Sequence, residues 1–337
     1  MHEVITLGEI MLRLSTPQGQ LLSDTPTLSA HYGGGEANVA ISLANFGHSA
    51  YFASCLPENA LGLGVKQHLQ KYGVGTDYLK FSDDEMARLG TYYLTSGVAQ
   101  RASQVIYDRA YSAFSALTTD IWAAEEMFKG KTLCHISGIT PALSQPWQEL
   151  TKRLIKKAKA AGCLISFDVN YRAKLWSQAD AGQYLQQILP LVDFCSAGEK
   201  DAKYLLNLFE DQTADVDLET CYQKITAAFP NLQVLYATKR QVMSATHHQL
   251  QGFIYRKQKL TASNSHTIDM IVDRVGTGDA FAAGILHGLL EDWQDEQIVN
   301  FATAAATLKH TIYGDTNQFS ETDVLRFMAQ ASSQIDR

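Results

Sequence analysis

The sequence predicts an α/β fold with a mostly parallel central sheet, helices on both faces and a small β-sheet lid. Short apolar runs alternate with stretches of helical periodicity along most of the 337 residues, as in chains of βαβ units. Two segments, Met11–His31 and Arg88–Asp108, interrupt this alternation. The sequence shows no internal repeat and no long linker, so we expect one domain over residues 1–337.

The elements of the main body can be assigned in order along the chain. The predicted strands are Glu3–Gly8, Ala50–Cys55, Leu133–Ser137, Leu164–Val169, Phe194–Ser196 and Val234–Thr238. The predicted helices are Asn38–Phe46, Gly64–Tyr72, Gln148–Ala161, Glu199–Phe209 and Glu219–Phe229. A glycine follows each of the first two helices, at Gly47 and Gly73, where a helix commonly ends. Strand and helix in turn favour a parallel sheet.

The two interrupting segments have a different composition from the rest of the chain. They are richer in Thr, Ser and Tyr and show partial alternation, as in Thr91–Leu94 and Gln104–Tyr107. This pattern is typical of strands with at least one exposed face. We therefore expect the lid to be drawn from about residues 11–31 and 88–110.

Charge and cysteine content exclude several classes of protein. The chain has 28 Lys and Arg against 35 Asp and Glu, a net charge of −7, which disfavours nucleic acid as a partner. No apolar run approaches the roughly 18 residues of a membrane span, and the opening residues Met1–Ile10 lack the basic start of a signal peptide. The cysteines are too far apart for a metal or redox motif: Cys55, Cys134, Cys163, Cys195 and Cys221. We expect a cytoplasmic protein with buried free thiols and no membrane partner.

The most informative segment is a glycine-rich loop that leads into a helical pattern, Asp273–Phe281. Gly276 and Gly278 let the backbone approach a ligand closely, and the helix start after them offers free N–H groups to an anion. Asp279 could take a proton from a hydroxyl that attacks phosphorus, or it could cap the helix. A dinucleotide fingerprint is excluded because position 281 is Phe, and a P-loop ending at Lys131 is excluded because Glu125 replaces its glycine.

Two further segments carry candidate binding residues. Gly33, Gly34 and Gly35 precede a predicted helix, where a ligand could lie against the backbone and Asn38 could bind a hydroxyl. A plain tight turn would explain these glycines equally well. A strand that ends near Asp168 is followed by Arg172, which could hold a phosphate or a carboxylate, or form a surface ion pair.

Several of these segments together resemble a known family. Gly33–Gly47 and Asp273–Gly284 are similar to the two signature regions of the ribokinase-type (phosphofructokinase-B) carbohydrate kinases, and the match runs nearly the whole chain. Within that family, Gly8-Glu9, Ser137–Ser144 and Asp168–Arg172 most resemble 2-keto-3-deoxygluconate kinases. The resemblance implies a ribokinase-like fold and transfer of the γ-phosphoryl group of ATP, with Mg²⁺, to 2-keto-3-deoxygluconate. Two alternative functions stay open. The protein could be a kinase for another sugar such as fructose, or a catalytically silent regulatory protein that binds a sugar or a nucleotide.

The resemblance also implies roles for individual residues. Asp279 would be the catalytic base, and Gly276, Thr277 and Gly278 would form an anion hole. The substrate-binding residues would be Gly34, Gly35, Asn38, Tyr92, Tyr107, Arg109, Arg172 and Asp279. The nucleotide-binding residues would be Asn170, Arg172, Ser196, Thr238, Lys239, Arg240, Gly276, Gly278 and Asn300. Arg109 is the expected partner of a substrate carboxylate, because a neutral sugar would leave a buried Arg with nothing to pair with.

Two positions depart from the family pattern. The Asn-x-x-Glu motif near Mg²⁺ reads Gly198–Asp201 here, so Glu199 and Asp201 are the candidate metal residues, acting through water. The loop Thr238–Ser244 lacks the two usual glycines, and Lys239 or Arg240 could bind phosphate by charge instead. Relatives in this family also imply a homo-oligomer, and they leave open whether a monovalent cation assists.

Overall fold

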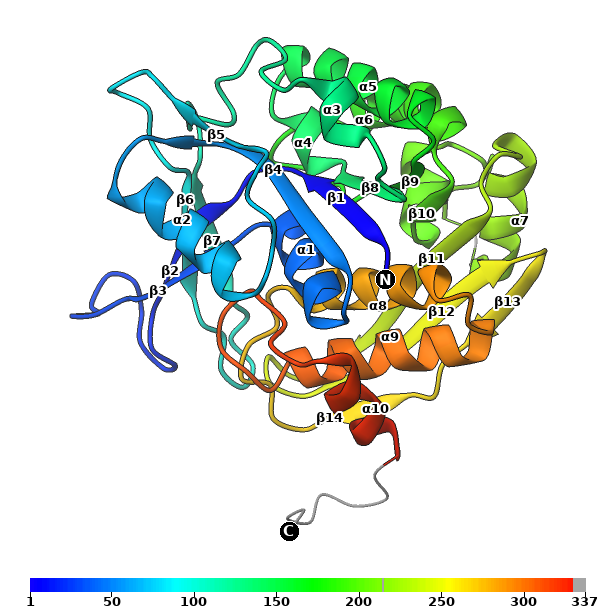
Figure 1. Ribbon diagram of the computed structural model, residues 1–337. Helices are drawn as coiled ribbons and strands as arrows, with labels where there is room; N and C mark the ends of the chain where they lie inside the picture. The colour runs from blue at the N-terminus through cyan, green and yellow to red at the C-terminus, as the bar shows by residue number, and fades with distance from the viewer. Residues whose placement is uncertain (214, 330–337) are drawn as a thin grey trace.

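A ten-stranded sheet forms the centre of the molecule, shown by a computed structural model that describes residues 1–213 and 215–329 (Figure 1). Its strands are β1 (Glu3–Leu7), β4 (Ser49–Pro57), β5 (Leu79–Ser82), β8 (Leu133–Ser137), β9 (Leu164–Asp168), β10 (Phe194–Ser196), β11 (Val234–Val242), β12 (His248–Arg256), β13 (Lys259–Ala262) and β14 (His266–Ile268). They follow the order β13-β12-β11-β10-β9-β8-β1-β4-β5, with β14 paired to β12. The run from β11 to β5 is parallel throughout, whereas β12 and its neighbours are antiparallel. The predicted mostly parallel sheet is confirmed.

Helices cover both faces of this sheet and enclose two apolar cores (Figure 1). One face carries α3 (Ala124–Phe128), α5 (Gln145–Ala160), α6 (Gln178–Ile188) and α7 (Leu218–Ala228). The other face carries α1 (Gly35–Asn45), α2 (Ala60–Lys71), α8 (Thr277–Leu290), α9 (Asp295–Lys309) and α10 (Glu321–Ala329). A short helix, α4 (Ile139–Ala142), follows β8, and a 3₁₀ turn, Leu189–Leu191, follows α6. Helix α5 shows how sequence sets a boundary: Ser144 Oγ accepts a hydrogen bond from the Trp147 amide, and Trp147 is fully buried.

A separate four-stranded sheet stands beside the main body, as expected for the lid. It is built from β2 (Met11–Ser15), β3 (Ser29–Gly33), β6 (Thr91–Thr95) and β7 (Gln104–Asp108), in the order β3-β2-β6-β7. Alternation along β2 and β6 places Arg13 and Tyr92 on a buried face and Leu12 and Tyr93 on the opposite, half-exposed face. The small sheet therefore has two chemically different faces.

Two predicted elements differ from the structure. The helix predicted over Glu199–Phe209 is present but shorter: residues 199–205 are helical, the last five of them as a π-helical turn, Asp201–Leu205, and Asn207 beyond it has a left-handed backbone (φ 51°). The strand predicted over Val234–Thr238 continues to Val242, because its second half pairs with β12. Its last residues are polar and exposed, so they lack the apolar signal of the first half.

Two features expected from composition can be checked directly. All five cysteines are buried and free, as predicted. Among the described residues, no helix is both long and apolar enough to cross a membrane.

Candidate active site

A cavity of about 380 Å³ lies between the small sheet and the start of α8. It is lined by residues from the glycine-rich loop, the start of α1, the end of β9 and the small sheet. The predicted residues that it brings together are Gly34, Gly35, Asn38, Tyr92, Tyr107, Arg109, Asn170, Arg172, Arg240, Gly276, Gly278 and Asp279. Segments far apart in the sequence thus meet at one site, at the carboxyl ends of parallel strands.

Asp279 lies in the first turn of α8 and faces this cavity. Its Oδ2 accepts a hydrogen bond of 2.7 Å from Asn38 Nδ2, and it accepts no helix-capping bond among the described residues. Burial raises the pKa of Asp279 to about 7, and the charges of Asp168 and Glu36 act in the same direction. A carboxyl group with a pKa near neutrality suits proton transfer from a hydroxyl.

The loop before Asp279 depends on a glycine at position 276. Gly276 has a left-handed backbone (φ 80°) and is the residue from which α8 begins. A Cβ at this position would lie 1.8 Å from the carbonyl oxygen of Asp315, so no other residue fits. Thr277 Oγ1 donates to the Arg274 carbonyl at 3.0 Å, which fixes the turn. The first N–H groups of α8 lack partners within the helix and are available to an anion.

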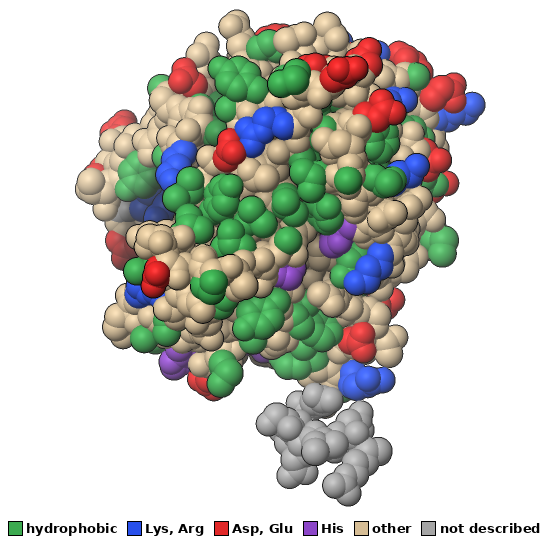
Figure 2. Space-filling model, turned by 90° about the vertical axis from the view of Figure 1, so that its left-hand side faces the viewer, with side chains coloured by type: hydrophobic (Ala, Val, Ile, Leu, Met, Phe, Trp, Pro, Cys, Tyr) green, Lys and Arg blue, Asp and Glu red, His purple; other side chains and the backbone are tan. Residues whose placement is uncertain are grey.

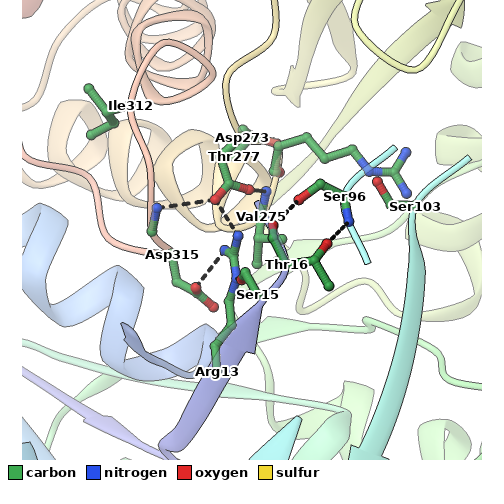
Figure 3. A network of polar contacts seen from close by, with 12 residues as sticks. Arg13, Ser15, Thr16, Ser96, Ser103, Asp273, Val275, Thr277, Ile312 and Asp315 are labelled. Atoms are coloured by element: carbon green, nitrogen blue, oxygen red, sulfur yellow. Dashed lines mark hydrogen bonds and ion pairs between the residues drawn. The ribbon is translucent and has the colours of Figure 1, made fainter. Parts of the chain in front are cut away.

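An ion-pair cluster behind this loop joins it to the small sheet (Figure 3). Arg13 of β2 donates to Asp315 Oδ1 at 2.9 Å and pairs with Asp273 through its other terminal nitrogen. Asp273 Oδ1 accepts a hydrogen bond from the Val275 amide at 3.1 Å, inside the loop itself. Tyr92 of β6 donates its hydroxyl to Asp315. All these side chains are buried, so the small sheet and the loop are positioned by the same charges.

Arg109 has a partner within the chain. Its Nε donates to Glu9 Oε2 at 2.8 Å, and Ser112 also donates to the Glu9 carboxylate. The argument that a buried Arg109 would require a substrate carboxylate is therefore wrong, because Glu9 already neutralises it. Arg109 still lines the cavity.

Three other arginines line the cavity without an ion-pair partner in the described part of the chain. Arg172, Arg240 and Arg274 line it, and none of them has an ion pair among the described residues. Burial and the neighbouring charge of Arg274 lower the pKa of Arg240, as expected for two adjacent cations. Unpaired guanidinium groups around one cavity favour an anionic ligand.

The remaining predicted residues lie outside this cavity. They are Ser196, Thr238, Lys239, Asn300, Glu199, Asp201 and Thr277. Lys239 Nζ lies 3.6 Å from Glu199 Oε1, and Asp201 Oδ2 accepts a hydrogen bond of 2.7 Å from the Gly198 amide. Asn300 lines a second cavity of about 400 Å³ and accepts a hydrogen bond of 2.9 Å from the Asn264 amide.

Several lining residues had no assigned role in the sequence analysis. Glu36 and Asp168 belong to the two quoted ligand-binding segments, so their position was a usable signal. Burial raises the pKa of Asp168 to about 6, while Ser196 and Arg172 lower it. Asp315 gave no local signal, and Glu9 was named only within the Gly8-Glu9 motif, because the partner of each is a distant arginine.

Comparisons with known proteins agree with this architecture. The sequence profile of the pfkB family carbohydrate kinases matches residues 1–323. A 2-dehydro-3-deoxygalactonokinase from Haloferax volcanii is 33% identical over 335 residues, which cover 99% of each chain.

Two solved structures have nearly the same fold. A PfkB family carbohydrate kinase from Listeria grayi is 44% identical, with a TM-score of 0.92 over 97% of this chain and 100% of the other. A 2-dehydro-3-deoxygluconokinase from Thermotoga maritima is 35% identical, with a TM-score of 0.92 over 98% of this chain and 100% of the other. The ribokinase-like fold, with its small separate sheet, is thereby confirmed. These matches span almost the entire chain, and the protein belongs to the pfkB family of carbohydrate kinases.

Proposed function

We propose that this kinase transfers the γ-phosphoryl group of ATP to the terminal hydroxyl of a 2-keto-3-deoxy sugar acid, with 2-keto-3-deoxygluconate as the preferred substrate. The observation that carries the proposal is Asp279, a carboxyl group with a pKa of about 7 beside a helix start in an arginine-lined cavity. Relatives above 30% identity are named as kinases of the galacto and of the gluco acid. Both substrates carry the carboxylate that such a cavity favours.

In this proposal Asp279 acts as the general base. Asn38 donates a hydrogen bond to Asp279 Oδ2, which leaves Asp279 Oδ1 to accept the hydroxyl proton. A Cβ at Gly35 would lie 3.7 Å from Asp279 Oδ1 and 3.9 Å from Asn170 Nδ2, so the glycine leaves the approach to Oδ1 open. As the proton moves to Asp279, the hydroxyl oxygen bonds to the γ-phosphorus and the bond to the ADP oxygen breaks.

Charge on the transferring group would be stabilised from two directions. The N–H groups after Gly276 face it from α8, where the helix dipole also favours negative charge. Arg172, Arg240 and Arg274 are the cations available for the phosphates and for the substrate carboxylate. Since phosphoryl transfer needs little covalent chemistry from the protein, positioning and charge supply most of the catalysis.

The cavity also suits the Mg²⁺ ion that accompanies ATP. Magnesium is bound through one or two carboxylates together with phosphate oxygens and water, and Asp168 lines the cavity. We propose Asp168 as the main carboxylate beside the ion, with the predicted Glu199 and Asp201 further out. When bound, Mg²⁺ would neutralise charge on the nucleotide phosphates.

We further propose that the small sheet acts as a lid and that a second copy of the chain packs on its outer face. Figure 2 shows hydrophobic side chains gathered on the side where α2 and the small sheet lie. Tyr93 and Ile106 belong to this outer face, whereas Leu12 and Tyr32 on the same side of the sheet pack against the second core. A largely apolar face can pack against the same face of a second copy, which favours a homo-oligomer as the assembly. Light scattering should then give at least twice the mass of one chain.

The substrate is tested by ADP release with ATP and Mg²⁺. The panel contains 2-keto-3-deoxygluconate, its galactonate epimer, fructose, ribose and adenosine. We expect turnover of the two keto-deoxy acids only, with the gluconate faster. Faster turnover of the galactonate would change only the proposed stereochemistry of the substrate. Turnover confined to a neutral sugar would contradict the proposal that the substrate is a sugar acid. Failure of every substrate while ATP still binds would favour a regulatory protein.

A further inference from the structure

A cluster of two histidines and a glutamate lies at the end of α8 remote from Asp279. His48 follows α1, His287 belongs to the last turn of α8, and Glu291 comes directly after that helix. The two histidines are 5% and 1% exposed, whereas the Glu291 side chain is 36% exposed. No step of the proposed phosphoryl transfer uses these residues.

The two imidazoles leave nitrogens without partners. His48 Nε2 and His287 Nδ1 lie 2.9 Å apart and share one hydrogen bond. The outer nitrogens, His48 Nδ1 and His287 Nε2, have no hydrogen-bond partner among the described residues. Glu291 Oε1 lies 3.9 Å from the first, and Glu321 Oε1 lies 3.8 Å from the second. Buried polar atoms without partners are uncommon in native proteins and call for an explanation.

The spacing of the three side chains fits one ion. One nitrogen of each imidazole and one oxygen of Glu291 lie within 4.8 Å of one another. Ligands on a tetrahedral zinc ion, with bonds of about 2.0–2.1 Å, lie about 3.3 Å apart. Small rotations of the rings and of the half-exposed Glu291 would therefore close the cluster around a metal.

The ligand types select the class of metal. Two imidazoles and a carboxylate suit Zn²⁺, whereas Mg²⁺ prefers oxygen ligands alone. Burial lowers the pKa of His48 to about 4 and that of His287 to about 3, so both rings are neutral near pH 7, as ligands must be.

We infer that His48, His287 and Glu291 form a binding site for a zinc-type divalent ion. The ion would join the end of α8 to the segment that follows α1. The inferred site is structural and separate from the Mg²⁺ of the kinase reaction. The inference rests on the contacts among these side chains, and it does not depend on which substrate the kinase phosphorylates.

Zinc binding is measured on the full chain after dialysis against EDTA, by calorimetric titration and by thermal unfolding. We expect one Zn²⁺ per chain and a rise in Tm on the order of 5 °C, with no such rise from Mg²⁺ at the same concentration. Glu291→Gln should weaken zinc binding at least tenfold. Because the Glu291 side chain is partly exposed, we expect this variant to fold normally. His287→Gln should abolish the visible spectrum of bound Co²⁺.

The control variant is His247→Gln, which removes an exposed histidine that lies 3.3 Å from Asp269. It should bind Zn²⁺ like the unmodified chain. The inference is overturned if the unmodified chain takes up no Zn²⁺ at about 100 times the protein concentration. It is also overturned if Glu291→Gln binds Zn²⁺ with unchanged affinity.

Discussion

The two sheets of this kinase are held in place by different forces. The ten-stranded sheet is fixed by apolar cores on both faces, in which side chains such as Trp147 and Phe301 are fully buried. The small sheet meets the body through charged side chains, Arg13 with its two aspartates and Arg109 with Glu9. Polar interfaces within one chain favour relative movement of the parts they join. The candidate active-site cavity lies where these two kinds of packing meet.

This difference shows what each region contributes to the site. The body supplies Asp279 and the helix start, on a rigid element. The small sheet supplies Tyr92, Tyr107 and Arg109, and through Arg13 it also positions the loop around Gly276. If the small sheet closes as proposed, its movement would therefore be transmitted to the loop around Gly276.

Apart from loss of Asp279 itself, the largest expected effect comes from closing the space at Gly276, on the body side. Gly276→Ala forces a Cβ to within 1.8 Å of the Asp315 carbonyl oxygen on a left-handed backbone, so the loop must move. We expect kcat to fall about a hundredfold to a thousandfold, as for loss of an anion-hole donor. Steady-state ADP release measures it. Gly130→Ala is the matched control, since Gly130 also has a left-handed backbone (φ 74°), a Cβ there meets nothing within 4 Å, and it does not line the cavity; equal losses in both variants would contradict the account.

The next largest effect is expected from loss of the Arg13 charge, which joins the small sheet to the body. Arg13→Met leaves Asp273 and Asp315 buried without their cation, and we expect a loss of about 3–5 kcal/mol in the free energy of unfolding. Urea unfolding gives the value. Arg88→Met, which breaks the exposed pair with Asp108, should lose much less, because solvent screens that pair. Similar losses of unfolding free energy in the two variants would show that Arg13 does not join the small sheet to the body.

A smaller effect is expected on the substrate side of the small sheet. Arg109→Ala should raise KM for sugar acids about tenfold with little change in kcat, because Arg109 lines the cavity while Glu9 shares its charge. Kinetics with a sugar acid and its neutral analogue separate the two parameters. Unchanged discrimination between the two substrates would remove Arg109 from substrate recognition.

The smallest effect concerns the pH profile. Asp279 must be ionised to accept a proton, so kcat/KM should fall about tenfold per unit below its pKa of about 7 and level off above it. Asn38→Ser removes a hydrogen bond that favours the ionised form, and the profile should shift to higher pH. A profile that stays in place, or moves to lower pH, would assign the ionisation to another group.

The sequence was sufficient for the fold and for the local part of the site. The glycines of the loop, Asp279 and Asn38 belong to short segments whose spacing has a physical meaning, and the structure brings them into one cavity. Such segments are readable because the loop and the helix that it starts are contiguous in the chain.

Contacts between distant residues could not be predicted in the same way. Arg13 and Asp315 are 302 positions apart, and no periodicity links them. Arg109 is an example. The sequence pointed to Glu9 only as part of a family-like motif, and not as the ion-pair partner of Arg109. The paired histidines His48 and His287 also meet only after folding.

The most direct test of the account is the activity of Asp279→Asn with ATP, Mg²⁺ and 2-keto-3-deoxygluconate. The amide keeps the shape of the side chain but cannot act as a base. We expect kcat to fall at least about a thousandfold, with ATP affinity and the urea midpoint unchanged. A variant that keeps most of its activity would contradict the assignment of Asp279 as the base.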